Sequence, residues 1–230
     1  MKLKYISFVA FAMTLSLSSC YDLNRFPGDQ LSNEKFYRNE EHAKEAMMAV
    51  YNQMQKEDVF GLQFAMDGLG GIAMGYDPQS YQTIQRGTYD VKNGRVLGKW
   101  QNLYEGIARA NGVLQNVDRC QMSDELKVQY KAEAKFMRAL YYFTLMDFFG
   151  GVPVYDESVI VSESYSEMKN KRESIENVRA FILKDLKEAA DKLPEAWDKA
   201  NYGRATKYAA LAQMGKVYLY AKDYQHAKDC

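Results

Sequence analysis

Apolar residues recur at helical spacing in five segments of this chain, and this periodicity restricts the possible folds more than any other feature. The run from Phe136 to Phe149 is apolar almost all round, interrupted only by Arg138, Thr144 and Asp147. A helix with apolar residues on every side is buried by several neighbours. The sequence therefore predicts a helical core built around this segment.

The five apolar stripes also predict which side of each helix faces that core. In chain order they consist of Phe36, Ala43, Met47, Val50 and Met54; Trp100, Leu103, Ile107, Ala110, Leu114 and Val117; Tyr130, Ala134, Met137, Tyr141, Leu145 and Phe148; Ile175, Val178, Ile182, Leu186, Ala189 and Leu193; and Ala210, Met214, Val217 and Ala221. Residues suited to cap the first, third, fourth and fifth helices are Ser32 or Asn33, Ser123, Ser174 and Thr206. On this pattern Phe148 faces the core, whereas Glu133 belongs to the polar side of the third helix.

Small residues at matching places indicate how the helices pair. Gly215, Tyr218 and Ala227 have the spacing of tetratricopeptide positions at which two helices approach closely. We predict an all-α fold of tetratricopeptide-like helix pairs with long irregular insertions at residues 58–97 and 150–172. The last pair is expected to be incomplete at the C-terminus, leaving an apolar face of the fifth helix exposed. A generic helical bundle is the alternative.

The first 32 residues have the features of an export signal and a tether. Residues 1–19 combine two lysines, an uncharged apolar run and small residues at the exit, as secretory signals do. Leu17-Ser18-Ser19-Cys20 fits the bacterial lipobox, so we expect cleavage before Cys20 and acylation of its thiol, which anchors the chain to a membrane. Residues 20–32 are predicted to be a tether and residues 33–230 the helical domain.

Composition restricts the partners. Removal of Lys2 and Lys4 with the signal leaves 28 of the 30 basic residues beside 30 acidic ones, which gives no electrostatic basis for binding nucleic acid. The two histidines lack other ligands at metal spacing, and no cofactor is expected. Cys120 and Cys230 are interpreted as free thiols.

Three segments resemble a known family. The stretches "EAKFMRALYYFTLMDFFGGVPVY" (133–155), "ESIENVRAFILKDLKEAADKLPE" (173–195) and "GRATKYAALAQMGKVYLYAKDYQHA" (203–227) are similar, in order and spacing, to segments of SusD/RagB outer-membrane lipoproteins. The resemblance implies a protein facing the cell surface of Bacteroidetes. There it would capture glycans or peptides and pass them to a SusC-like TonB-dependent transporter. Family members are longer, so the resemblance also implies a truncated N-terminal part.

Candidate ligand contacts lie in the first insertion. Tyr76, Tyr81 and Tyr89 belong to no apolar stripe, and exposed tyrosines can stack on sugar rings while their hydroxyls bond sugar hydroxyls. Trp100 begins a stripe and is therefore interpreted as a core residue rather than a sugar platform. The carboxylates are scattered along helix faces and indicate no catalytic residues, so no enzyme is predicted. A tetratricopeptide scaffold that binds protein, or less readily a helical glycosidase, remains the alternative.

Overall fold

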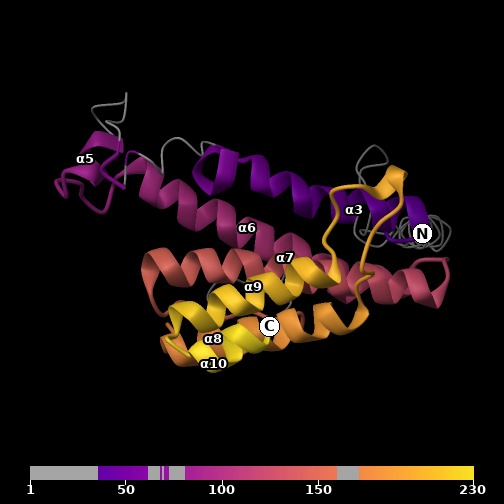
Figure 1. The fold of residues 1–230 in the computed structure, drawn as a ribbon. Coiled ribbons are helices and arrows are strands. Elements are labelled where there is room, and N and C mark those ends of the chain that lie inside the picture. The colour runs from indigo at the N-terminus through magenta and orange to yellow at the C-terminus, as the bar shows by residue number, and fades with distance from the viewer. Residues whose placement is uncertain (1–35, 62–67, 69, 73–80, 160–170) are drawn as a thin grey trace, which may run out of the picture. The chain divides into compact units, whose positions relative to one another are not determined.

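The computed structural model describes residues 36–61, 68, 70–72, 81–159 and 171–230, and its regular elements are helices (Figure 1). Residues 37–230 form one unit. An isolated bridge joins Asn39 and Gln121, and the described ranges contain no strand. The predicted all-α fold class is confirmed. None of the helices in these ranges has the length and hydropathy needed to cross a bilayer.

The helices are adjacent in space largely in the order of the chain. The longer ones are α3 (Glu40–Asn52), α6 (Gly94–Asn116), α7 (Asp124–Phe149), α8 (Ile175–Lys192) and α9 (Lys207–Tyr220). Short elements are η2 (Gln53–Gln55), η3 (Glu57–Gly61), α5 (Tyr81–Gln85), η4 (Val117–Arg119), η5 (Lys199–Asn201) and α10 (Tyr224–Asp229). Helix α7 packs against α3, α6, α8 and α9, while α10 packs against α9. The segment that is apolar all round is therefore the central helix, as predicted.

Capping side chains fix most of the helix starts. Ser123, Ser174 and Thr206 each accept a hydrogen bond from the backbone N–H three residues later, at 3.3, 3.1 and 3.2 Å, which confirms three predicted starts. The predicted caps of the first helix, Ser32 and Asn33, lie outside the described residues, and α3 itself starts later than the predicted helix. Helix α3 begins at Glu40, because Asn39 is extended and accepts from the N–H of His42 at 3.0 Å.

Two predicted orientations on α7 are also wrong. Phe148 is 44% exposed, whereas Glu133 is completely buried. Glu133 lies beneath the connection between α8 and α9, where Arg204 forms an ion pair with it. Phe148 lies in the last turn of α7, and the ammonium of Lys99 stands 4.5 Å from the centre of its ring. A neighbour therefore covers the predicted polar side, and the end of the apolar stripe reaches solvent.

The C-terminal helices pack as a tetratricopeptide-like pair. A Cβ added to Gly215 would lie 3.6 Å from the carbonyl oxygen of Ala227, so α9 and α10 are in van der Waals contact there. The rings of Tyr218 and His226 stack with centroids 5.0 Å apart. The expected exposed face is wrong in one part, because Val217 is fully buried.

A buried arginine of α7 attaches the segment between α7 and α8 to the neighbouring helices. Arg138 donates from Nε and Nη2 to the two carboxylate oxygens of Asp185 at 2.7 and 2.9 Å. Its Nη1 donates to Asn111 and to Glu157, both at 2.6 Å. The amide of Asn111 in turn donates to the carbonyl of Tyr155 at 3.1 Å. These bonds fix residues 155–157 against α6, α7 and α8.

Candidate ligand-binding site

The structure brings two of the three predicted tyrosines to one pocket. Tyr81 and Tyr89 both line it, whereas Tyr76 and the lipid-attachment candidate Cys20 lie outside the described residues. Tyr89 is 50% exposed, as expected of a ligand contact. Tyr81 is only 7% exposed, so the expectation that it is an exposed tyrosine is wrong.

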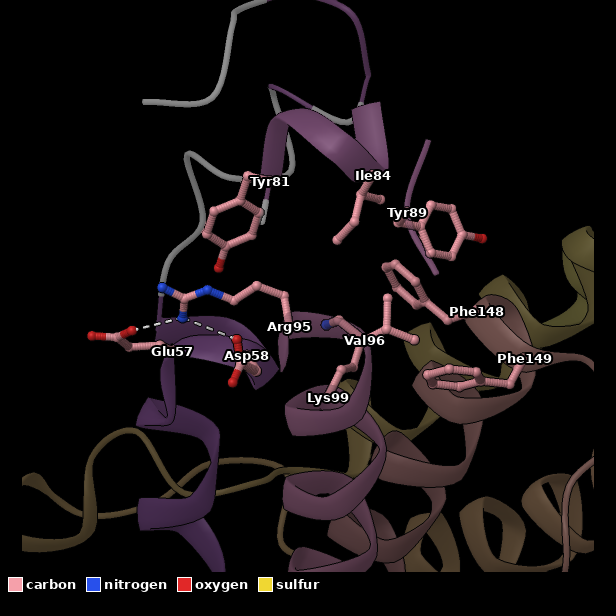
Figure 2. A pocket seen from close by; sticks show the side chains of 10 residues that line it. All are labelled: Glu57, Asp58, Tyr81, Ile84, Tyr89, Arg95, Val96, Lys99, Phe148 and Phe149. Carbon is pink, nitrogen blue, oxygen red and sulfur yellow. Dashed lines mark hydrogen bonds and ion pairs between the residues drawn. The ribbon is translucent and has the colours of Figure 1, made fainter. Parts of the chain in front are cut away.

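The pocket is formed where η3, α5, α6 and the end of α7 meet. Figure 2 shows Tyr81 and Ile84 of α5 on one side, the first turns of α6 opposite them, and the last residues of α7 beside them. The cavity has a volume of about 180 Å³. Its lining residues are Glu57, Asp58, Tyr81, Ile84, Tyr89, Arg95, Val96, Lys99, Phe148 and Phe149.

A glycine on α6 allows the carboxylate side of the pocket to form. The short helix η3 places Asp58 against the second turn of α6, and a Cβ at Gly98 would lie 2.2 Å from Asp58 Oδ2. Any larger residue at position 98 would displace that carboxylate. Asp58 therefore lies directly against α6, with its carboxylate beside the backbone of Gly98.

Arg95 forms ion pairs with both acidic side chains of the pocket. Its Nη1 donates to Glu57 Oε2 at 2.9 Å and to Asp58 Oδ1 at 3.2 Å. The guanidinium carbon lies 4.7 Å from the ring centre of Tyr81, within the range of a cation–π contact. The hydrogen bond to Glu57 raises the pKa of Arg95 above its ordinary value. Tyr81 thus holds Arg95 in place, and Tyr89 is the tyrosine with the more accessible ring.

Lys99 supplies a second cation at the base of the pocket. It is 7% exposed, and its Nζ donates to the carbonyl of Val59 at 3.2 Å. Burial lowers the pKa of this ammonium to about 8. The ring of Phe148 covers one side of it.

Trp100 is part of the packing behind this site rather than of its lining. Its ring meets Phe149 edge-on with centroids 5.1 Å apart and lies 5.0 Å from the ring of Tyr104. It is half-buried. These contacts support the interpretation that Trp100 packs α6 against the end of α7.

The arrangement suits binding better than hydrolysis. Aromatic rings beside charged donors and acceptors can take up a sugar ring, with its apolar face on an aromatic side chain and its hydroxyls on the polar groups. Both carboxylates bond the same guanidinium, whereas a glycosidase holds two carboxyl groups on opposite sides of the bond that it cleaves. Within the described ranges, no three His, Cys, Asp or Glu residues are grouped as a metal site requires. Cys120 is a buried free thiol and Cys230 an exposed one.

Sequence reasoning found Tyr81 and Tyr89 but not the charged groups or Phe148. Glu57, Arg95 and Phe148 are widely separated in the chain, and no motif spacing connects them. The sequence feature that pointed to this site was the long insertion before α6, whose residues line the pocket together with the end of α7.

Comparison with known proteins places the chain in a family. Residues 28–219 match a family model described as "Starch-binding associating with outer membrane". The chain belongs to the SusD-like family. A SusD-like protein of Bacteroides ovatus is 28% identical over 222 residues, which are 95% of this chain and 39% of the relative. SusD-like protein P25 of Formosa agariphila is 26% identical, over 90% of this chain and 42% of the relative. The chain therefore spans less than half the length of these relatives.

Solved SusD-like structures have the same helical arrangement. A laminarin-binding SusD-like protein is 30% identical, with a TM-score of 0.73 over 83% of this chain and 42% of that protein. A SusD homologue from Bacteroides thetaiotaomicron is 25% identical, with a TM-score of 0.71 over 86% and 39% of the two chains. The predicted resemblance to the SusD family is confirmed.

Proposed function

We propose that this SusD-like chain captures glycans at the bacterial surface for uptake and that the pocket between α5, α6 and α7 contributes to their binding. The observation that carries the proposal is the combination of Tyr89 and Phe148, two partly exposed aromatic side chains, with the polar groups of Arg95 and Lys99 in one cavity. Aromatic faces and convergent polar groups are the usual elements of carbohydrate recognition. Family membership supports the same ligand class.

We further propose that residues 1–19 are removed, that Cys20 carries the lipid anchor, and that residues 20–32 are a tether. The remaining domain would then lie outside the outer membrane and pass its ligand to a SusC-like TonB-dependent transporter. The lipobox supports the anchor, and the family's association with the outer membrane supports the location. Incorporation of a clickable fatty acid, lost in Cys20→Ser, would test the anchor directly.

Binding to immobilised glycans tests the main proposal. The affinity of the protein from residue 21 onward for immobilised neutral and charged oligosaccharides is measured, and the same is done for a Tyr89→Ala/Phe148→Ala variant. Tyr208→Ala is a matched control, because Tyr208 is 55% exposed on α9 and does not line the pocket. We expect the double variant to lose affinity at least tenfold and the control to keep it. Unchanged affinity in the double variant would exclude this pocket. Retention of a glycan or a peptide would argue against the scaffold alternative, and failure to retain either would favour it.

A further inference from the structure

Lys99 is a buried ammonium without a carboxylate partner in the part of the chain that the structure describes. Among the described residues its one hydrogen bond goes to the Val59 carbonyl, although an ammonium carries three donors. None of the ion pairs formed by the described residues includes Lys99. A buried charge is stable only when nearby groups compensate it.

The acidic residues beside Lys99 are already engaged. Arg95 bonds both Glu57 and Asp58. The side chain of Glu57 is 64% exposed, so water screens its charge, whereas that of Asp58 is 16% exposed. The charge of Asp58 also acts on Lys99, where it opposes the lowering of the Lys99 pKa by burial. With Glu57 screened by water, the less exposed groups are one carboxylate and two cations, so one positive charge remains that an incoming ligand could neutralise.

The walls of the pocket would strengthen such an interaction. Phe148 lies 4.5 Å from the Lys99 ammonium, and Val96, Ile84 and Phe149 also line the cavity. Apolar surroundings lower the local dielectric constant, so an opposite charge is attracted more strongly than in water. The cavity of about 180 Å³ is also smaller than the roughly 300–1,000 Å³ typical of pockets that enclose a drug-sized ligand. It therefore suits one sugar unit or its substituent, with the rest of the chain outside.

From this geometry we infer that the pocket selects anionic glycans, whose carboxylate or sulfate group bonds Lys99 while the sugar ring packs against Phe148 and Tyr89. The inference rests on the proposed glycan-binding function and narrows its substrate class. Lys99 is then a specificity-determining residue.

Two pairs of probes, each with a charged and an uncharged member, test this inference. Oligogalacturonates are titrated as free acids and as methyl esters, and agaro-oligosaccharides with and without sulfate groups form the second pair. We expect the charged member of at least one pair to bind the wild-type protein at least tenfold more tightly. The pair that shows the preference identifies carboxylate or sulfate as the recognised group.

Variants at Lys99 connect the preference to this side chain. Lys99→Met removes the charge while keeping much of the aliphatic stem, and we expect the ratio of the two affinities to fall to about one. Lys92→Met removes the same charge from an exposed lysine outside the pocket lining and should keep the ratio. Lys99→Arg should restore most of the preference for the charged probe. Circular dichroism shows whether each variant is folded.

The outcomes separate this inference from the proposed function. Equal affinity for charged and neutral probes, or a preference that survives in Lys99→Met, would overturn the inference while leaving glycan binding intact. Failure of the wild-type protein to bind any probe or any neutral glycan would contradict the proposed function and the inference together.

Discussion

Arg204 donates from Nε and Nη2 to the two carboxylate oxygens of Glu133, which is completely buried on α7. The hydroxyl of Tyr51 donates to the same carboxylate at 2.8 Å and accepts from the N–H of Ala205 at 2.9 Å. The guanidinium of Arg204 also lies 4.1 Å from a ring centre of Trp197. One buried carboxylate thus joins the end of α3, the middle of α7 and the connection before α9.

Glu133→Ala should be strongly destabilising because it leaves Arg204 half-buried without its counter-ion. Removing one partner of a buried ion pair typically costs about 3–5 kcal/mol. Urea unfolding followed by circular dichroism measures the change. Asp191→Ala is the control, since it breaks an exposed pair with Lys187 and should change stability by less than about 1 kcal/mol. Equal unfolding midpoints for the two variants would contradict the assigned role of Glu133.

The periodicity predicted α7 as the central helix but assigned Glu133 to the wrong environment. A stripe of apolar residues identifies one buried side, and it carries no information about a polar loop that covers the other. Glu133 is buried because Arg204 and Tyr51, 71 and 82 residues away, converge on it. Such pairing is a tertiary property. Helix existence and capping depend on neighbouring residues, which explains why Ser123, Ser174 and Thr206 could be identified.

Phe148→Ala should affect binding more than folding. Because its side chain is 44% exposed, little apolar surface is lost, and we expect a destabilisation of about 1 kcal/mol or less. Tyr141→Ala is the comparison, since Tyr141 is fully buried and its hydroxyl donates to the Val50 carbonyl at 2.6 Å. That change should cost roughly 3–5 kcal/mol, as large aromatic truncations in cores do. A larger loss of stability in Phe148→Ala than in Tyr141→Ala would show that the end of α7 is covered.

Because of Lys99, the free energy of unfolding should depend on pH in the alkaline range. Burial lowers its pKa from 10.5 to about 8 in the folded protein, against the opposing effect of Asp58. Between these values the unfolded chain binds more protons, so stability rises with pH in that window and this contribution is absent in Lys99→Met. Between about pH 7 and pH 10, the wild type should gain on the order of 2 kcal/mol relative to the variant. Parallel pH profiles of the two proteins would contradict a buried, charged Lys99.

The site could be anticipated only where the sequence marks it locally. Tyr81 and Tyr89 stood out because they lie in an insertion and outside any apolar stripe. Lys99 occupies a position inside α6, where a lysine is normally solvated, and nothing nearby in sequence indicates its burial. It is buried because η3 and Phe148 cover it, and both come from other parts of the chain. Contacts of that kind follow from the fold.

Two helical glycines should respond oppositely to the same substitution. A Cβ at Gly106 would lie 2.6 Å from the ring of Tyr141, which cannot move away because it is fully buried and hydrogen-bonded to Val50. A Cβ at Gly215 would lie 3.5 Å from Cys230 Cβ and 3.6 Å from the Ala227 carbonyl oxygen, which are ordinary contacts. Gly106→Ala should therefore destabilise the protein by roughly 1–3 kcal/mol through overpacking.

Gly215→Ala should be neutral or stabilising by up to about 1 kcal/mol, because alanine restricts the unfolded chain and favours the helix. Urea unfolding midpoints of the two variants, compared with that of the wild type, give the signs directly. A stabilised Gly106→Ala would mean that α6 and α7 are further apart than described. A strongly destabilised Gly215→Ala would mean that α9 and α10 approach more closely than these distances, so that the added methyl group would clash with α10.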